Sequence, residues 1–196
     1  MSDVRAVRQV YGRFANRPFS TLFPHCILGV LLTESQYNMS RRTLMPTSLV
    51  LRRARETDLE IIVQFNRTMA KETEDIILDV DTVRRGAMAV LNDPRRGFYL
   101  LAEVTGRVAG QLMVTPEWSD WRDQWFWWIQ SVYVAPGFRR RGLFAALFRE
   151  VEKRAAGRGD VAGIRLYVDN ENTGAQKTYK ALGMQESNYR MYEKEG

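Results

Sequence analysis

Cysteine and histidine are almost absent from this chain, which holds one of each, Cys26 and His25, among 196 residues. A single cysteine cannot form a disulfide within the chain, so a reducing, cytoplasmic setting is expected. A single histidine argues against zinc sites built on histidine and against Ser-His catalytic triads. We therefore expect no metal cofactor, and chemistry that does not depend on histidine.

Long apolar runs are also lacking. None approaches the roughly 20 residues that a helix needs to span a bilayer. With 45% hydrophobic and 27% charged residues, the composition is that of a globular protein without membrane partners.

Positive charge is in excess, with a net charge of +6, but the excess is local. Residues 1–46 hold six arginines and two acidic residues, whereas the remainder holds 23 basic and 21 acidic residues. A remainder so close to neutral disfavours a broad nucleic-acid surface and favours a small anion pocket. We expect no nucleic-acid partner.

A change in composition near Met45 predicts two parts. Residues 1–45 form an Arg-rich N-terminal extension, and residues 46–196 form the folded domain. The extension is typical of a mitochondrial targeting leader. It also fits a flexible segment that is not native to the working protein, since translation could begin at Met39 or Met45, and we favour this second interpretation.

Hydrophobic periodicity and turn residues predict alternating strands and helices after residue 46. The order β-α-α-β-β-β-α-β-α-β is typical of a mixed sheet with helices on its faces. The expected strands cover 48–54, 98–104, 108–115, 125–134, 164–168 and 187–192, and the expected helices cover 56–72, 82–91, 143 onward and 173–182.

All five tryptophans lie in the stretch 118–128, WSDWRDQWFWW. Strand alternation places Trp125 and Trp127 on one face of the sheet, and Phe126 and Trp128 on the other. A strand that is apolar on both faces is predicted to be central and buried.

Three consecutive arginines, Arg139, Arg140 and Arg141, stand at the predicted start of a helix, where the helix dipole already disfavours cations. The cluster makes physical sense if an anion such as a phosphate binds there, on the free amides of the first turn. Gly142 would allow close backbone approach. A P-loop is excluded, because Leu143 and Phe144 stand where that motif needs Lys and Ser/Thr.

The stretch VYVAPGFRRRGLFAALF resembles motif A of the GNAT (Gcn5-related) N-acetyltransferases, whose core is [Q/R]-x-x-G-x-[G/A]. Downstream, Asn172, Ala175, Tyr179, Gly183 and Met184 fit the family's N-x-x-A-x-x-x-Y-x-x-x-G-[FM] pattern. The resemblance covers roughly 48–193. It implies an α/β (α+β) fold with a mixed, mostly antiparallel sheet of about six to seven strands and about four helices.

The resemblance further implies that acetyl-CoA is the co-substrate. Its pyrophosphate would lie on the motif A loop, and its pantetheine arm would pair with the backbone of the preceding strand. The implied contact residues are Val132, Tyr133, Val134, Arg139, Arg140, Arg141, Gly142, Leu143, Phe144, Asn172, Ala175 and Tyr179. Phe144 departs from the family's Gly or Ala, and its ring either crowds the ligand or faces the core; we favour the core.

The implied reaction is direct attack of a primary amine on the thioester, with transfer of the acetyl group. Tyr179 matches the position of the family's general acid, which would protonate the departing thiolate. It also lies on an apolar helical stripe with Ala175 and Leu182, so a packing role is the alternative.

Glu117 is the best candidate for the general base, ahead of Asp120 and Asp123 in the loop and of Glu72, Glu74 and Asp75 at the end of the first helix. The alternatives are that these are solvated surface carboxylates and that a base acts through water.

The acceptor amine is not identified by the sequence. Candidate acceptor-binding residues are Glu72, Glu74, Trp118, Asp120 and Trp121, with the two tryptophans near Glu117 suited to a cationic or aromatic amine. Trp118 and Trp121 fit a homodimer contact equally well. The alternative function is a non-catalytic sensor domain that binds CoA or acyl-CoA.

Overall fold

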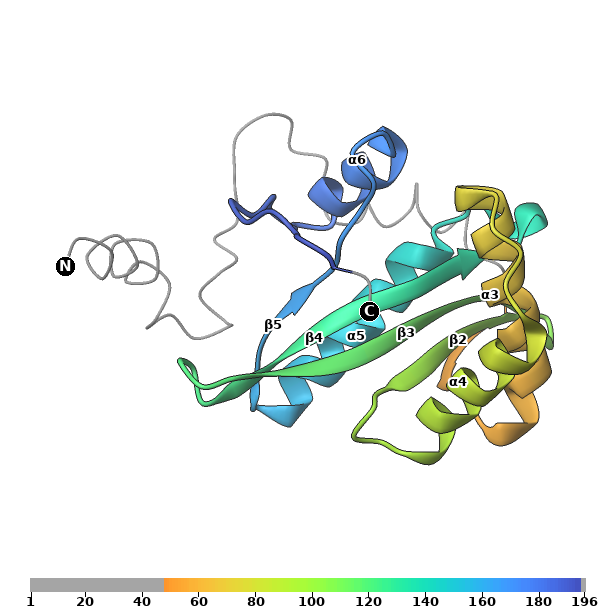
Figure 1. Cartoon of the computed structure of the whole chain (residues 1–196), viewed down its shortest axis with the longest axis horizontal. Coiled ribbons are helices and arrows are strands. Elements are labelled where there is room, and N and C mark those ends of the chain that lie inside the picture. The colour runs from red at the N-terminus through yellow and green to blue at the C-terminus, as the bar shows by residue number, and fades with distance from the viewer. Residues whose placement is uncertain (1–47, 195–196) are drawn as a thin grey trace. The chain divides into compact units, whose positions relative to one another are not determined.

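The computed structural model describes residues 48–194, so the predictions for the extension 1–45 lie outside the described residues (Figure 1). The chain divides into two compact units, Met1–Arg165 and Leu166–Gly196. Each unit is described by itself below.

A five-stranded sheet forms the centre of the first unit, and its strands follow one another in chain order. Neighbouring strands run antiparallel, except β4 and β5, which run parallel. The mixed, mostly antiparallel sheet is confirmed, with five strands in the described residues instead of six to seven. The strands are β1 (Leu49–Arg53), β2 (Phe98–Val104), β3 (Arg107–Ser119), β4 (Gln124–Val134) and β5 (Val161–Arg165).

Two strands expected toward the C-terminus differ from the prediction. The one placed at 164–168 is β5, three residues earlier, and the one placed at 187–192 is not formed. At that site the Ser187 Oγ accepts a hydrogen bond from the Tyr189 N–H at 3.0 Å. A side chain that satisfies the backbone locally competes with a sheet ladder, and this competition explains the missing strand.

The loop expected between the strands 108–115 and 125–134 is instead the end of a long hairpin. β3 continues to Ser119, and Pro116 lies opposite Trp127 within the ladder. β2 pairs with β3 only as far as Val114, so Pro116 lies where the outer edge of β3 has no strand partner among the described residues. A proline, which has no N–H, is tolerated at such an edge.

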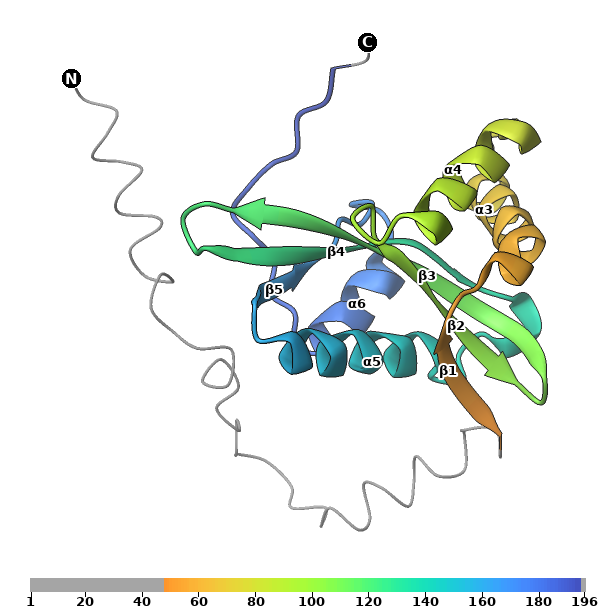
Figure 2. The same cartoon turned by 90° about the horizontal axis from the view of Figure 1, so that it is seen from below.

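Helices cover both faces of the sheet. α3 (Leu59–Glu74) and α4 (Val80–Asn92) lie on one face, and α5 (Leu143–Arg158) lies on the other (Figure 2). Two short 3₁₀ turns, η2 (Glu56–Asp58) and η3 (Pro136–Phe138), precede α3 and α5. With α6 of the second unit, the four predicted helices are all found. Within 48–194, no helix is both long and apolar enough to cross a membrane.

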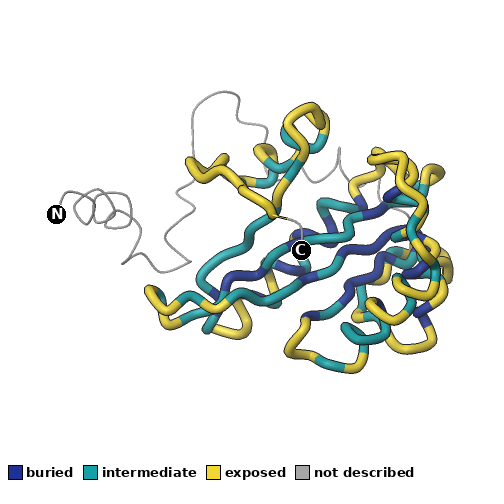
Figure 3. The backbone as a smooth tube through the Cα atoms, in the orientation of Figure 1, coloured by how far each residue is buried: buried dark blue, intermediate teal, exposed yellow. Residues whose placement is uncertain are grey.

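The buried residues follow the strands and the inner sides of the helices (Figure 3). On one face, Tyr99 and Leu101 of β2 pack with Ile62 and Val63 of α3 and with Ala87 of α4. Helix α5 buries Leu143, Leu147 and Val151, each at most 1% exposed. Trp127 and Phe126 are both buried, and β4 lies between β3 and β5, so the prediction of a central, buried strand is confirmed.

The second unit contains one helix, α6 (Thr173–Ala181). The side chain of Asn172 accepts a hydrogen bond from the Ala175 N–H at 3.0 Å and thereby caps the helix. Gly183, with φ of +88°, follows the helix and ends it in the left-handed conformation that glycine favours.

Asp58 fastens β1 to the start of α3. Its carboxylate accepts hydrogen bonds from Arg52 Nη1 and Nη2, both at 2.8 Å, and from the Arg55 N–H at 2.7 Å. Arg52 also donates to Glu103 on β2 at 2.8 Å. Because the Arg52 hydrogen bond stabilises the charged form, the pKa of Asp58 lies below its ordinary value.

We expect Asp58→Ala to lower the free energy of unfolding by about 2–3 kcal/mol at pH 7, since it removes two of the hydrogen bonds of the partly buried Arg52 and the acceptor of the Arg55 N–H. A carboxyl group with a lowered folded pKa contributes stability above its unfolded pKa of about 3.9, and loses it as the pH falls toward the folded pKa. The deficit of the variant, measured by urea unfolding, should therefore shrink below pH 4.

Asp81→Ala is the control, because Asp81 pairs with Arg84 with its side chain 68% exposed. It should cost less than about 1 kcal/mol. An equal loss in the two variants would contradict the special role of Asp58.

Candidate functional site

An open strand edge begins where β5 ends. β5 pairs with β4 from Trp125 to Trp128 only, so among the described residues 129–134 have no strand beside them on that edge. The Ala135 N–H donates to Ala109 of β3 at 2.9 Å. Because the hydrogen-bonding direction alternates along a strand, the amide and carbonyl of Val134 face the open edge. Their orientation makes them available to an extended ligand.

A bulge interrupts this edge. Gln111 lies opposite Tyr133 and Met113 opposite Gln130, so two residues of β4, Ser131 and Val132, face a single residue of β3. Ser131 has φ of +49°, a left-handed conformation that is unusual for a residue with a side chain. A bulge of this kind changes the direction of the backbone groups that follow it.

Gln111 supports the bulge from below. Its fully buried side chain donates to the Asn66 Oδ1 of α3 at 2.7 Å and to the Ser131 carbonyl at 3.4 Å. Sequence reasoning did not identify Gln111 or Asn66. A polar residue inside the apolar run VAGQLMV was the available signal, because a buried amide requires partners.

The loop before α5 combines left-handed residues with the start of a helix. Arg140 has φ of +59° and Gly142 has φ of +78°, and left-handed residues of this kind turn backbone N–H groups toward a common point. The first hydrogen bond within the helix runs from the Ala146 N–H to the Gly142 carbonyl at 3.0 Å. The amides of residues 143–145 therefore have no carbonyl within the helix, and the first turn holds no acidic residue.

The three arginines of this loop differ in their surroundings. Arg139 donates from Nη2 to the Glu72 carboxylate at 2.5 Å and from Nε to the Val134 carbonyl at 2.8 Å. Arg141 lies with its Cζ 5.6 Å from the Phe138 ring. Arg140 is exposed, and its guanidinium has no hydrogen bond or ion pair to another described residue. Arg140 and Arg141 thus remain available to an anion, whereas Arg139 is held at α3.

Glu72 joins α3 to the end of β4. Besides Arg139, its carboxylate accepts a hydrogen bond from the Tyr133 hydroxyl at 3.2 Å. The Tyr133 ring packs against Phe65 with a centroid distance of 4.9 Å. Glu72 was predicted to contact the acceptor, but the structure engages its carboxylate with Tyr133 and the motif A loop. Glu74, predicted with it, is exposed at the end of α3.

The pKa of Tyr133 lies above its ordinary value because the hydroxyl is removed from water and faces the negative charge of Glu72. Tyr133 therefore remains protonated at neutral pH and donates its hydrogen bond. The sequence predicted only a backbone role for Tyr133. The role of its side chain could not be predicted from the local sequence, because its partner Glu72 lies 61 residues away along the chain.

Phe144, which departs from the family pattern, packs along α5. Its ring centroid lies 6.1 Å from that of Phe148, which is 2% exposed. This position agrees with the expected packing of Phe144 toward the apolar side of the helix. Leu143 beside it is 1% exposed, so both residues have only backbone amides to offer an anion.

Glu117 belongs to a cluster on the sheet face that α3 and α4 partly cover. Its carboxylate accepts hydrogen bonds from the Trp128 Nε1 and from the Arg165 Nη1, the latter at 3.1 and 3.3 Å to its two oxygens. The Arg165 Cζ lies 3.5 Å from the centroid of the Phe126 ring. Nearby, Gln130 donates to Thr115 at 2.6 Å. The candidate base Glu117 is thus a carboxylate that is ion-paired with Arg165 and lies beside the aromatic side chains of Phe126 and Trp128.

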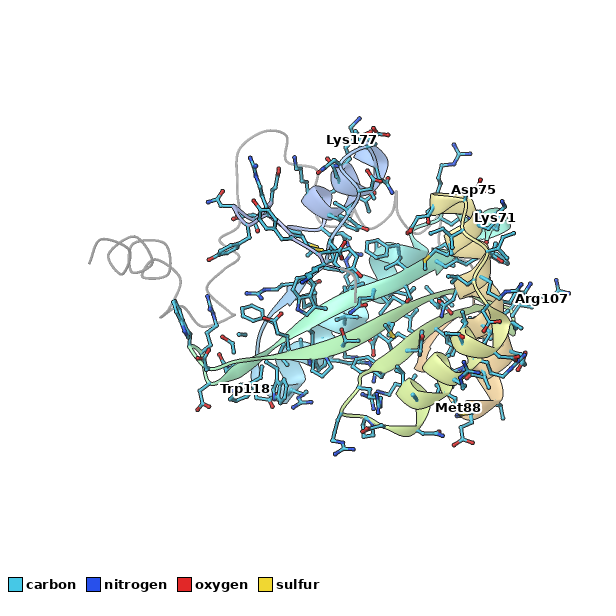
Figure 4. All side chains as sticks on the ribbon, in the orientation of Figure 1. Lys71, Asp75, Met88, Arg107, Trp118 and Lys177 are labelled. Atoms are coloured by element: carbon cyan, nitrogen blue, oxygen red, sulfur yellow. The ribbon has the colours of Figure 1, made fainter. Side chains whose placement is uncertain are left out.

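Trp118, near the end of the hairpin, lies on the opposite face of the sheet from this cluster. Trp118 lies at the free end of the β3–β4 hairpin (Figure 4) and packs against Trp125 with a centroid distance of 4.9 Å. Side chains alternate between the faces of a strand, so Trp118 and Glu117 point to opposite faces. This corrects the expectation that the two line one pocket. Asp120 and Trp121 are exposed in the turn that follows.

In the second unit, the residues of the downstream motif lie on or beside α6. Asn172 caps the helix, and Ala175 and Tyr179 are partly buried. Burial raises the pKa of the Tyr179 hydroxyl, which therefore carries its proton at neutral pH, as a general acid must. The roles predicted for these three residues toward a ligand remain predictions.

Known proteins resemble the chain in sequence and in fold. The model of the "Acetyltransferase (GNAT) family" matches residues 58–184. A possible acetyltransferase from Clostridium difficile 630 is 44% identical, with a TM-score of 0.72 over 76% of this chain and 97% of that one. AAC(6')-Iy, solved with a bisubstrate analogue, is 20% identical and has a TM-score of 0.62 over 76% of this chain and 99% of that one.

A mycothiol acetyltransferase of Mycolicibacterium gilvum (strain PYR-GCK) is 36% identical over 95 residues. That match covers 46% of this chain and 30% of the relative, so the chain spans less than a third of the length of this curated relative.

We expect Tyr133→Phe to lower the free energy of unfolding by about 1 kcal/mol at pH 7, because Glu72 loses a hydrogen bond. A group with a raised folded pKa contributes stability below its unfolded pKa of about 10, and loses it as the pH rises through the folded value. The wild type should therefore begin to lose its advantage over the variant as the pH rises above about 10 in urea titrations.

Tyr192→Phe is the matched control, since Tyr192 is 88% exposed. It should leave the stability within about 0.5 kcal/mol of the wild type at each pH. A constant difference between wild type and Tyr133→Phe up to pH 11 would contradict the raised pKa.

Proposed function

Because the chain belongs to the GNAT family of acetyltransferases, we propose that it transfers the acetyl group of acetyl-CoA to a primary amine. The observation that carries the proposal is the open edge of β4 leading directly into a loop with an unneutralised helix N-terminus. Such a pair of features suits a ligand with an extended amide-bearing arm and a diphosphate, and coenzyme A has both.

The diphosphate of acetyl-CoA fits the motif A loop by charge and by backbone geometry. The amides of 143–145, the left-handed residues Arg140 and Gly142, and the guanidinium groups of Arg140 and Arg141 supply donors and positive charge. A bound diphosphate would offset the repulsion between these cations and the positive end of the helix. Arg139 contributes by holding the loop to Glu72 and Val134.

The pantetheine arm fits the open edge as an added strand. Its amide groups would pair with backbone groups of β4 between Val132 and Val134. The Val134 carbonyl already accepts from Arg139, but a carbonyl oxygen has two lone pairs and can accept a second donor.

The direction of the arm follows from the position of the loop. With the diphosphate at residues 139–145, the arm runs back along β4 toward Ile129. The five residue steps from Val134 to Ile129 span about 17 Å at the rise of a strand. The thioester would then lie near the point where β4 and β5 separate, beside the bulge at Ser131.

In the proposed reaction the neutral amine attacks the thioester carbonyl, a C–N bond forms and the C–S bond breaks. A backbone N–H near the bulge would stabilise the oxyanion. The amine gives up one proton, for which Glu117 is the proposed acceptor, directly or through water. The thiolate of CoA takes up one proton, for which Tyr179 is the proposed donor.

The engagement of Glu117 favours one alternative function. Both of its oxygens already accept hydrogen bonds from Arg165 or Trp128, so an incoming amine would have to compete with donors that are already in place. A non-catalytic domain that binds CoA or acyl-CoA as a sensor is consistent with that arrangement. Thiol release above the rate of thioester hydrolysis, in the presence of amines, would exclude the sensor.

We expect acetyl-CoA at about 100 times its Kd to stabilise the wild type by about 2.7 kcal/mol, which raises the Tm by about 5–10 °C. The double variant Arg140→Glu, Arg141→Glu should lose that shift, because two cations facing the diphosphate become anions. Differential scanning fluorimetry measures both.

Arg149→Glu is the matched control, since Arg149 is exposed on α5 about 9 Å along the helix from its first residue. It should retain the full shift. Failure of the wild type to respond to millimolar acetyl-CoA would rule out the proposed co-substrate.

We expect Tyr179→Phe to lower kcat by about 100-fold, the lower range for loss of a general acid. The Tm shift with acetyl-CoA should persist, because the ring is retained. Thiol release followed with a chromogenic disulfide measures kcat, with Tyr192→Phe as control. An unchanged kcat would assign Tyr179 to packing alone.

A further inference from the structure

The geometry at the fork between β4 and β5 points to an acceptor that carries a carboxylate beside its amine. We propose a small amino acid or a related zwitterionic amine, with its carboxylate on Arg165 and its amine beside Glu117. The proposal rests on the proposed acetyl transfer and specifies its acceptor class.

The position of Arg165 is the first support. Trp128 and Arg165 form the last pair between β4 and β5, after which β4 continues alone. Arg165 is therefore the residue of β5 nearest to the open edge on which the thioester is proposed to end. Paired residues of neighbouring strands project to the same face, so the Arg165 side chain shares its face with Trp128 and Phe126.

The Arg165 guanidinium is held in a fixed place but is not saturated. Its Cζ lies 3.5 Å from the centroid of Phe126 and 5.7 Å from that of Trp128, and its side chain is 36% exposed. Only Nη1 binds Glu117; Nε and Nη2 donate to no other described residue. A planar guanidinium with two free donors is suited to a carboxylate.

Gly163 leaves space for the aromatic ring on which Arg165 stacks. Gly163 lies opposite Phe126 in the ladder, and a Cβ atom on it would lie 3.1 Å from the Phe126 Cε1. The absence of a side chain lets the Phe126 ring occupy that space, with Arg165 stacked on the ring. Such support reduces the loss of side-chain entropy when Arg165 binds a ligand.

The charges near the fork match a zwitterion. Glu117, with its side chain 43% exposed, lies 3.1 Å from Arg165, so one anion and one cation are presented side by side. An ammonium and a carboxylate on neighbouring atoms complement this pair. The Arg122 Cζ also lies 5.1 Å from the Phe126 ring, but Arg122 belongs to the hairpin turn, where Asp120 and Asp123 offset its charge, so Arg165 is the cation counted at the fork.

A polycationic acceptor is less well matched. Besides Glu117, the acidic residues of the hairpin are Asp120 and Asp123, which are exposed in the turn at the end of the hairpin remote from the fork. A polyamine or an aminoglycoside would bring several ammonium groups to one carboxylate that is already paired. Like charges would then face Arg165.

The test compares matched acceptors in a thiol-release assay with the full chain and acetyl-CoA. The panel holds the free amino acids, the corresponding amino acid amides, spermidine and kanamycin. We expect at least one amino acid to be acetylated with a kcat/KM about 30-fold above that of its amide, the effect of one charge-assisted contact. Arg165→Met should remove that preference mainly by raising KM, and Arg165→Lys should restore part of it.

Arg149→Met serves as the control and should keep the preference. The Tm shift with acetyl-CoA verifies that each variant is folded and binds the co-substrate. Acetylation of spermidine or kanamycin with inert amino acids, or equal rates for acids and amides, would overturn the acceptor class alone. No thiol release with any acceptor would overturn the proposed transferase, and this proposal with it.

Discussion

The separation of β4 from β5 after the Trp128–Arg165 pair is the constraint on which the proposed site depends. Hydrogen bonding between the strands stops there, and six residues of β4 have no strand on one edge within the described part of the chain. An open edge is costly unless a ligand, a loop or solvent satisfies its backbone groups. The bulge at Ser131 and the buried Gln111 amide below it keep this edge in one conformation. The loop that follows can then receive the other end of the same ligand.

Glu72 couples this edge to the helical layer. One carboxylate receives donors from Tyr133 of β4 and Arg139 of the loop, so the end of α3, the end of β4 and the start of α5 meet at a single group. Such a junction limits the conformations of the loop before any ligand arrives. Ordering the loop in advance reduces the entropy lost on binding. Arg140 and Arg141, whose side chains form no ion pair within residues 48–194, are then left to adjust to the ligand.

The sequence predicted the elements that local patterns determine and missed the contacts that join distant segments. Helical periodicity located α3 to α6, and the Arg-Gly stretch located the loop that precedes α5. The partnership of Arg139 with Glu72 joins residues 67 positions apart, and no local pattern encodes it. Pro116 was interpreted as a loop residue. A proline is tolerated in β3 at this position only because β2 ends before it, and the sequence does not show where β2 ends relative to β3. Trp118 was grouped with Glu117 because the extension of β3 through these residues was not recognised. In a strand, neighbouring side chains point to opposite faces.

Pro116 has a consequence for how copies of this protein meet in solution. From Ala109 onward, odd-numbered residues of β3 direct their amides to β4, and Pro116 falls on the outward-facing series. Another chain that added a strand to this part of the hairpin would need a backbone N–H donor at position 116, and proline has none. The exposed, tryptophan-rich arm is thereby protected from the intermolecular sheet growth that begins aggregation.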